Sequence, residues 1–108
     1  MKWYKVFDSY DVANKTIKPQ GAVLLQIGNR RLCFARHKNE YYVTDDKCPH
    51  NGESLSKGQV NYLGAIICPW HNYRFSLKHG TECEDRTHDL ATYSVEKRED
   101  GIFVGISD

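Results

Sequence analysis

The sequence predicts an all-β domain, an antiparallel sandwich or barrel. Short segments rich in β-branched and aromatic residues follow one another along the chain, and glycine-containing turns separate them. No segment shows convincing helical periodicity, and there are no repeats or low-complexity tracts. At 108 residues the chain has the length of a single small domain, which we expect to span residues 1–108.

The N-terminal part predicts strands at residues 3–7, 23–27, 30–36 and 41–44. The polar segment 8–21 is expected to be a long irregular connection. Gly28-Asn29 is a two-residue turn of the kind that closes hairpins, so the strands on either side of it should pair. The last three of these strands then form a meander that ends shortly before the first cysteine-containing loop.

The C-terminal part predicts strands at residues 59–62, 65–68, 74–77, 93–96 and 102–106. Leu63-Gly64 marks a turn between the first two of them. The resulting hairpin carries the chain away from one cysteine-containing loop and returns it to the next. Many short strands joined in this way predict an antiparallel β fold.

Two similar loops carry a candidate set of metal ligands. The first has the pattern Cys48-x-His50 and the second the pattern Cys68-x-x-His71, with seventeen residues between His50 and Cys68. Soft thiolate and imidazole in equal number are metal ligands. Because the intervening hairpin should bring the loops together, we predict these four residues as a metal site.

Each loop offers one thiol and one imidazole, and this mixture bears on the identity of the metal. Common zinc fingers place their two cysteines on one knuckle and their two histidines on a helix. A mixed pair in each loop suits a two-iron centre in which one iron takes both thiolates and the other both imidazoles. Two alternatives stay open: a zinc-stabilised interaction module with the same ligands, and two buried cysteines accompanied by ordinary surface histidines.

The ligand pattern, with Pro49 and Pro69 beside the ligands and Gly52 after the first pair, resembles the Rieske ferredoxins. The likeness extends over nearly the whole chain, including residues 45–47, 55–60 and 100–104. It implies a β-sandwich base that carries a small cluster-binding subdomain at about residues 46–78.

The resemblance also implies the cofactor and the role of each ligand. It predicts one [2Fe–2S] cluster, with Cys48 and Cys68 on the inner iron and His50 and His71 on the outer iron. Such a domain is an electron-transfer protein and performs no substrate chemistry itself. It would accept one electron from a reductase and pass it to an oxygenase or another redox enzyme. The alternative within the resemblance is a small redox subunit of an enzyme like nitrite reductase.

Departures from the high-potential relatives predict a potential at the low end of the Rieske range. The quinol-oxidising proteins have a disulfide over the cluster, whose two positions are Glu53 and Trp70 here. They also have a serine and a tyrosine that donate hydrogen bonds to sulfur, and these positions are Tyr73 and Phe75 here. Losing both donors destabilises the reduced cluster, because that state is the more negative one.

Composition excludes several other classes of function. The net charge of +1 gives no sign of a nucleic-acid interface, and no apolar run reaches the roughly 20 residues of a membrane span. The N-terminus shows no signal-peptide pattern, so we expect a cytoplasmic protein. The histidines outside the motif, His37, His79 and His88, are expected to be solvated surface residues.

Two cysteines lie outside the ligand motif, and a reducing compartment predicts both as free thiols. In the strand at residues 30–36, Leu32 and Phe34 should face one side and Cys33 and Ala35 the other. We therefore expect Cys33 in the core. Cys83 lies between two glutamates and is expected to be exposed.

Overall fold

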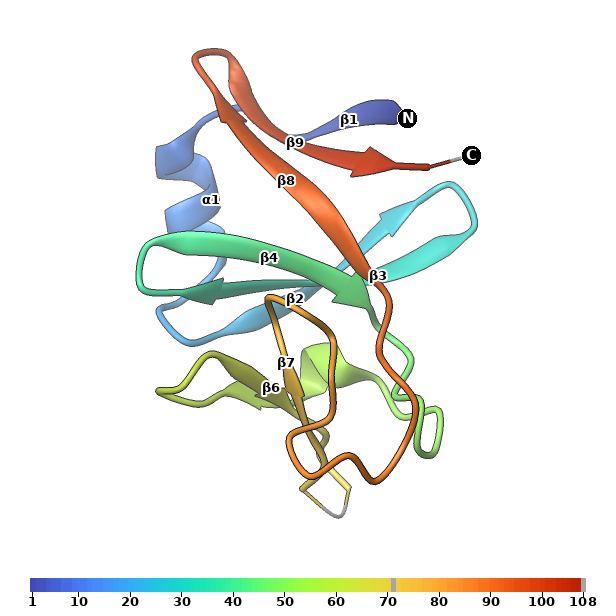
Figure 1. The fold of residues 1–108 in the computed structure, drawn as a ribbon. Helices are drawn as coiled ribbons and strands as arrows, with labels where there is room; N and C mark the ends of the chain where they lie inside the picture. Colours follow the sequence, from blue (N-terminus) through green and yellow to red (C-terminus); the bar gives the residue numbers. More distant parts are fainter. Residues whose placement is uncertain (71, 108) are drawn as a thin grey trace.

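Two antiparallel sheets and one short helix form the fold in the computed structural model, which describes residues 1–70 and 72–107 (Figure 1). Within these residues, the larger sheet has six strands in the order β1-β9-β8-β4-β3-β2, and the smaller has three in the order β5-β6-β7. The larger sheet comprises β1 (Lys2–Phe7), β2 (Ala22–Ile27), β3 (Arg30–His37), β4 (Glu40–Asp45), β8 (Thr92–Arg98) and β9 (Gly101–Ile106). The smaller comprises β5 (Gln59–Val60), β6 (Ala65–Ile67) and β7 (Arg74–Ser76), preceded by the 3-10 turn η1 (Leu55–Lys57). The all-β prediction is confirmed.

The segment 8–21 contains a helix, α1 (Tyr10–Thr16), so the prediction of an irregular connection was wrong. Ser9 caps the helix, because its hydroxyl accepts a hydrogen bond from the amide of Val12 (3.1 Å). Within the segment, only Ala13 and, just after the helix, Ile17 are buried. A helix of two turns therefore has too few buried apolar positions for helical periodicity to be detected in the sequence. Among the described residues, no helix has both the length and the apolar character of a bilayer span.

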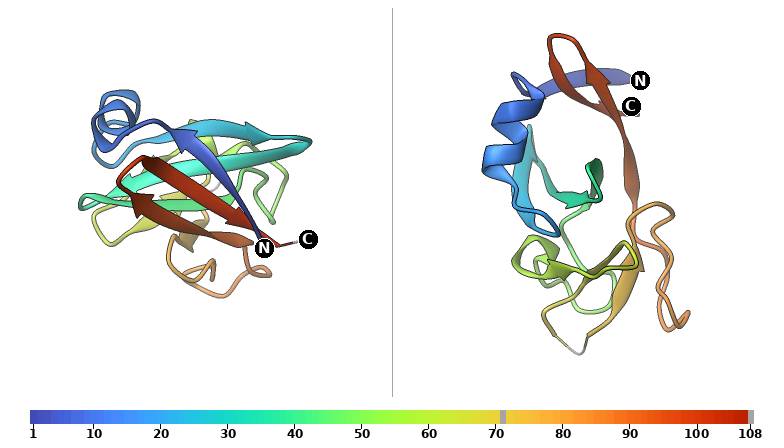
Figure 2. Two further views of the ribbon diagram at one scale, coloured as in Figure 1. Left: turned by 90° about the horizontal axis from the view of Figure 1, so that it is seen from above. Right: turned by 90° about the vertical axis from the view of Figure 1, so that its left-hand side faces the viewer.

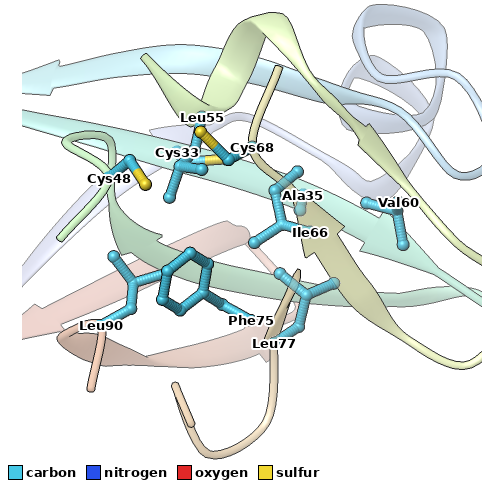
Figure 3. Packing of buried hydrophobic residues seen from close by; sticks show 10 residues of the cluster. All are labelled: Cys33, Ala35, Cys48, Leu55, Val60, Ile66, Cys68, Phe75, Leu77 and Leu90. Atoms are coloured by element: carbon cyan, nitrogen blue, oxygen red, sulfur yellow. The ribbon is translucent and has the colours of Figure 1, made fainter. Parts of the chain in front are cut away.

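Strand β3 lies between two hydrophobic cores, and the predicted alternation of its side chains is confirmed. Leu32 and Phe34 face a core inside the larger sheet, whose buried members also include Ala13, Ile17, Tyr41, Val43, Ile102, Val104 and Ile106. Cys33 and Ala35 face the second core together with Cys48, Leu55, Val60, Ile66, Cys68, Phe75, Leu77 and Leu90 (Figure 3). The second core therefore joins the larger sheet to the segment that carries the ligand motif.

The smaller sheet belongs to the segment 46–91, which lies between β4 and β8. The amide of Asp45 donates a hydrogen bond to the carbonyl of Ala91 (2.9 Å), so this segment leaves and re-enters the larger sheet at adjacent points. Figures 1 and 2 show the smaller sheet and its loops gathered at one end of the molecule. The narrower bounds of a cluster-binding subdomain, about 46–78, stay a prediction.

Candidate metal centre

The two predicted ligand loops span residues 48–53 and 68–73, and their described residues lie at the end of the molecule formed by the smaller sheet. The first is closed by its own backbone: the amide of Cys48 donates to the carbonyl of Glu53 (2.8 Å), and the amide of Gly52 donates to the carbonyl of Cys48 (2.8 Å). Gly52 has a φ of 79°, a left-handed conformation that side chains disfavour. Glycine therefore allows this loop to turn back within six residues.

The second ligand loop repeats the backbone arrangement of the first. The amide of Cys68 donates to the carbonyl of Tyr73 at 2.8 Å, again five residues later along the chain. Asn72 stands four residues after its cysteine, as Gly52 does after Cys48, and it too is left-handed, with a φ of 55°. Asparagine adopts this conformation more readily than most residues. The two loops thus present their cysteines in equivalent backbone settings.

The thiols of Cys48 and Cys68 are buried and interact with each other. The two residues are 1% and 0% exposed and belong to the same core (Figure 3). Burial raises the pKa of the Cys68 thiol, a backbone hydrogen bond from Trp70 lowers it, and the neighbouring Cys48 raises it again, so that the pKa is about 11 in all. A thiolate in this setting needs a strong positive charge beside it, as a bound metal provides.

Of the two histidines of the motif, the structure describes His50. His50 is half-buried, its Nδ1 atom is buried, and its ring stacks on the ring of Tyr73 with the centroids 3.8 Å apart and the planes at 11°. His71 lies outside the described residues. A contact between the loops is also present, since the thiol of Cys68 lies 3.8 Å from the Oδ1 atom of Asn51.

A buried carboxylate, that of Asp46, braces the first loop. Its oxygens accept hydrogen bonds from the hydroxyl of Ser54 and from the amide of Ser56 (2.8 Å). Arg31 lies 3.9 Å from the same carboxylate and is itself largely exposed. The side chain of Asp46 therefore fixes the chain on both sides of the loop, at its entry and where it passes into η1.

A second buried carboxylate, that of Glu82, braces the other side of the site. It accepts hydrogen bonds from the amides of Arg74 (3.3 Å), Glu84 (3.1 Å) and Arg86 (2.9 Å). The guanidinium group of Arg86 binds the same carboxylate through two further bonds, Nε to Oε1 (3.0 Å) and Nη2 to Oε2 (2.8 Å). Arg86 first, and the three backbone amides after it, lower the pKa of Glu82 to about 2.

Arg86 also contacts the ligand loops. Its guanidinium carbon lies 4.0 Å from the centroid of the Tyr73 ring, which contacts His50 as well. No role was predicted from the sequence for residues 82–89, so this contact was missed. The signal that was available is the spacing of Glu82 and Arg86, an opposite-charge pair four residues apart.

Two cysteines and three histidines lie outside the predicted motif in the sequence, and one of them, Cys33, packs in the same core as Cys48 and Cys68. Cys33 is buried and Cys83 is exposed, as predicted. His79 and His88 are exposed, also as predicted. His37 differs: it is the last residue of β3, is half-buried, and makes a ring hydrogen bond with the carbonyl of Tyr62 (3.0 Å).

The fold and the paired loops define a small all-β domain in which two loops of matching backbone bring two buried cysteines into one core. Comparison with protein families gives the more particular assignment: the model of the Rieske [2Fe–2S] domain matches residues 2–94. The chain therefore belongs to the Rieske [2Fe–2S] domain family. This membership confirms the predicted cofactor, one Rieske-type [2Fe–2S] cluster.

Several relatives are ferredoxin subunits of dioxygenases. The ferredoxin subunit of 3-phenylpropionate/cinnamic acid dioxygenase from Escherichia coli K12 is 33% identical over 89 residues, covering 82% of this chain and 84% of the relative. The corresponding subunit from Photorhabdus laumondii is 30% identical over 78 residues, covering 71% and 74%. These likenesses confirm the predicted resemblance to the oxygenase-associated Rieske ferredoxins.

Solved structures share the fold over almost the whole chain. A chain from the complex of reduced oxygenase and oxidised ferredoxin in carbazole 1,9a-dioxygenase is 28% identical, with a TM-score of 0.78 and coverage of 94% and 91%. The ferredoxin of carbazole 1,9a-dioxygenase from Nocardioides aromaticivorans IC177 has a TM-score of 0.83 at 18% identity, covering 99% and 100%. A putative nitrite reductase small subunit has a TM-score of 0.80 at 21% identity, covering 98% and 100%. The last two show the fold alone.

Proposed function

We propose that Cys48, His50, Cys68 and His71 hold the [2Fe–2S] cluster, and that the chain carries single electrons from a reductase to an oxygenase. The observation that carries this proposal is the matching closure of the two loops, which places two buried thiols against each other. For His71, the support is the spacing of the motif and the family resemblance. When bound, the cluster takes up and releases one electron at a time.

The donor set fits the electrostatics of such a cluster. Two thiolates neutralise the charge of an oxidised [2Fe–2S] core, whereas four would leave the site negative. Adding an electron to a neutral site is easier than adding one to a negative site. Because Cys48 and Cys68 are buried, little water is available to screen an excess charge there. Neutral imidazoles on the other iron are thus suited to this core.

The potential should lie toward the low end of the Rieske range of about −150 to +300 mV. Phe75, at one of the two hydrogen-bond-donor positions of the high-potential relatives, is fully buried and has no donor group. At the other position, the ring of Tyr73 packs flat against His50. A redox titration of the purified protein checks this expectation, and a midpoint well above zero would contradict it.

Partner enzymes would dock at the tips of the ligand loops. Trp70 is 55% exposed, and Asn51 and Asn72 are exposed beside the same loops. The relative described as a complex of oxygenase and ferredoxin supports an oxygenase as the acceptor. Replacing Trp70 by alanine should slow electron delivery to the oxygenase and leave the cluster spectrum unchanged. Tyr62→Ala is the matched control, since Tyr62 is 75% exposed in the β5–β6 turn rather than in a ligand loop.

The domain itself would perform no substrate chemistry, and we expect it to work in the cytoplasm. A small redox subunit of an enzyme like nitrite reductase is the second candidate, supported by the shared fold of such a subunit. Co-purification with a large catalytic subunit would favour this second role. Electron transfer to an isolated oxygenase would favour the free-standing carrier.

Electron paramagnetic resonance (EPR) of the dithionite-reduced protein tests the ligand set, with iron, sulfide and zinc measured on the same sample. We expect two irons and two sulfides per chain, and a rhombic signal whose average g value is below that of four-cysteine ferredoxins. Cys68→Ser should abolish this signal, whereas Cys83→Ser, at an exposed cysteine, should preserve it. One zinc per chain without sulfide would instead establish an interaction module with a structural metal.

A further inference from the structure

The candidate ligand His50 is the first layer of a stack of three groups, which continues with Tyr73 and Arg86. The rings of His50 and Tyr73 are nearly parallel, with centroids 3.8 Å apart, and the guanidinium carbon of Arg86 lies 4.0 Å from the centroid of Tyr73. Two groups cannot both occupy the space over one ring face at these distances. Tyr73 is therefore held between the imidazole on one face and the guanidinium on the other.

Glu82 fixes the outer layer of this stack. Its side chain is fully buried and binds Arg86 through Nε, Nη2 and the backbone amide. A two-pronged pair of this kind sets the plane of a guanidinium group as well as its position. Glu84 adds a contact to Nε (3.2 Å), although its own side chain is 56% exposed. Arg86 is thus held rigidly although a third of its side chain is exposed.

The stack connects three separate stretches of chain. His50 comes from the first ligand loop, Tyr73 closes the second by accepting the hydrogen bond from Cys68, and Arg86 comes from the segment after β7. The imidazole ring of His50 cannot rotate about its Cβ–Cγ bond without losing its parallel contact with Tyr73. The plane of the His50 ring is consequently set by a chain of contacts that begins at Glu82.

We propose that Arg86 is a positioning residue for the cluster ligand His50, and that it acts through Tyr73 to fix the plane of the imidazole ring. This inference rests on the proposed function, because it takes His50 as an iron ligand. Groups that orient a metal-bound histidine tune the electronic properties of the metal. The orientation of the ring should accordingly appear in the spectrum of the reduced cluster.

The test compares variants of the holoprotein by EPR, by the hyperfine couplings of the ligand nitrogens, and by the midpoint potential, all at matched iron content. Arg86→Ala should change the g anisotropy and the couplings of one nitrogen, and should shift the midpoint potential. Tyr73→Leu should reproduce these changes while leaving the Glu82–Arg86 pair in place. Tyr73→Phe keeps the aromatic ring and should match the wild type.

Arg74→Ala is the matched charge control. Arg74 also lies beside Glu84 (3.9 Å) and is partly exposed, but it is not one of the three stacked groups, and its bond to Glu82 comes from the backbone. Removing it should leave the g values and the nitrogen couplings unchanged. Equal potential shifts in Arg74→Ala and Arg86→Ala, with wild-type g values in both, would overturn the proposal and make Arg86 a simple surface charge.

Two further outcomes separate this inference from the proposed function. If the wild-type cluster shows no nitrogen couplings, the ligand assignment fails and the inference fails with it. If those couplings are present but unaffected by Arg86→Ala and Tyr73→Leu, the ligands stand and only the positioning role is refuted. Should Arg86→Ala fail to fold because Glu82 loses its partner, Tyr73→Leu alone decides the question.

Discussion

The backbone of Gly80 lies directly against the carbonyl group of Leu90. The amide of Leu90 donates to the carbonyl of Gly80 (2.7 Å), and a Cβ atom at Gly80 would lie 2.0 Å from the carbonyl oxygen of Leu90. Gly80 also has a φ of 77°, in the left-handed region. This contact holds the turn after β7 against the stretch of chain that returns to β8.

Gly80→Ala should consequently destabilise the protein more than an ordinary substitution in a turn. The left-handed conformation costs about 1 kcal/mol, and the clash with a backbone oxygen adds about 1 to 3 kcal/mol. Gly28→Ala is the control, because Gly28 has a φ of 59° but a Cβ atom added there would have no neighbouring atom within 4 Å. Urea unfolding of both variants measures the difference. Equal losses would show that the contact with Leu90 relaxes freely.

Asp46→Ala should loosen the first ligand loop. The substitution removes the acceptor for Ser54 and Ser56 and should cost about 1 to 3 kcal/mol, with faster loss of iron to a chelator. Arg31→Ala should cost less than about 1 kcal/mol, because that ion pair is long and its cation is exposed. Similar effects for the two variants would mean that the ion pair, and not the hydrogen bonds, braces the loop.

The carboxylate of Glu82 makes stability depend on pH in the acid range. Its pKa falls from 4.5 to about 2 on folding, so its ionised form stabilises the folded state above pH 4.5. This contribution is lost as the pH falls from about 4.5 toward 2. The difference in unfolding free energy between wild type and Glu82→Gln should therefore shrink over this window. A difference that stays constant from pH 7 to pH 3 would contradict the assignment.

Thiol labelling of the native holoprotein should modify one cysteine, Cys83. This residue is exposed, whereas Cys33 is fully buried and its pKa is raised to about 12, first by burial and then by Asp46. Cys48 and Cys68 are buried as well. Mass spectrometry after iodoacetamide treatment should show one adduct per chain, and none in Cys83→Ser. A second adduct without loss of iron would show that Cys33 is accessible.

Local sequence patterns were sufficient to predict the strands and the ligand motif. The alternation of Leu32, Cys33, Phe34 and Ala35 predicted a strand with two apolar faces, and the structure places a core on each side of it. The Cys-x-His and Cys-x-x-His pattern predicted a metal site, and its resemblance to the Rieske ferredoxins predicted the cofactor. Both predictions rest on patterns within short stretches of chain: one strand in the first case, and one loop for each Cys/His pair in the second.

Features that depend on tertiary contacts were not predicted. Helix α1 has an N-cap at Ser9, but its two turns are too short to show helical periodicity in the sequence. The core against which it packs is formed by strands that are distant along the chain. The stack of His50, Tyr73 and Arg86 joins three segments, and nothing in the neighbouring sequence of any one of them indicates the other two. Only the fold brings these groups together.

The hydrogen bond between Asp45 and Ala91 has a consequence for how the family can diversify. Since the segment 46–91 begins and ends at neighbouring points, evolution can lengthen, shorten or exchange it without moving the strands of the larger sheet. The main requirement on a replacement is an apolar surface to cover Cys33 and Ala35 on β3. The ligands and the docking residues proposed above all belong to this segment, so redox properties and partner choice would be inherited together, on a scaffold that need not change with them.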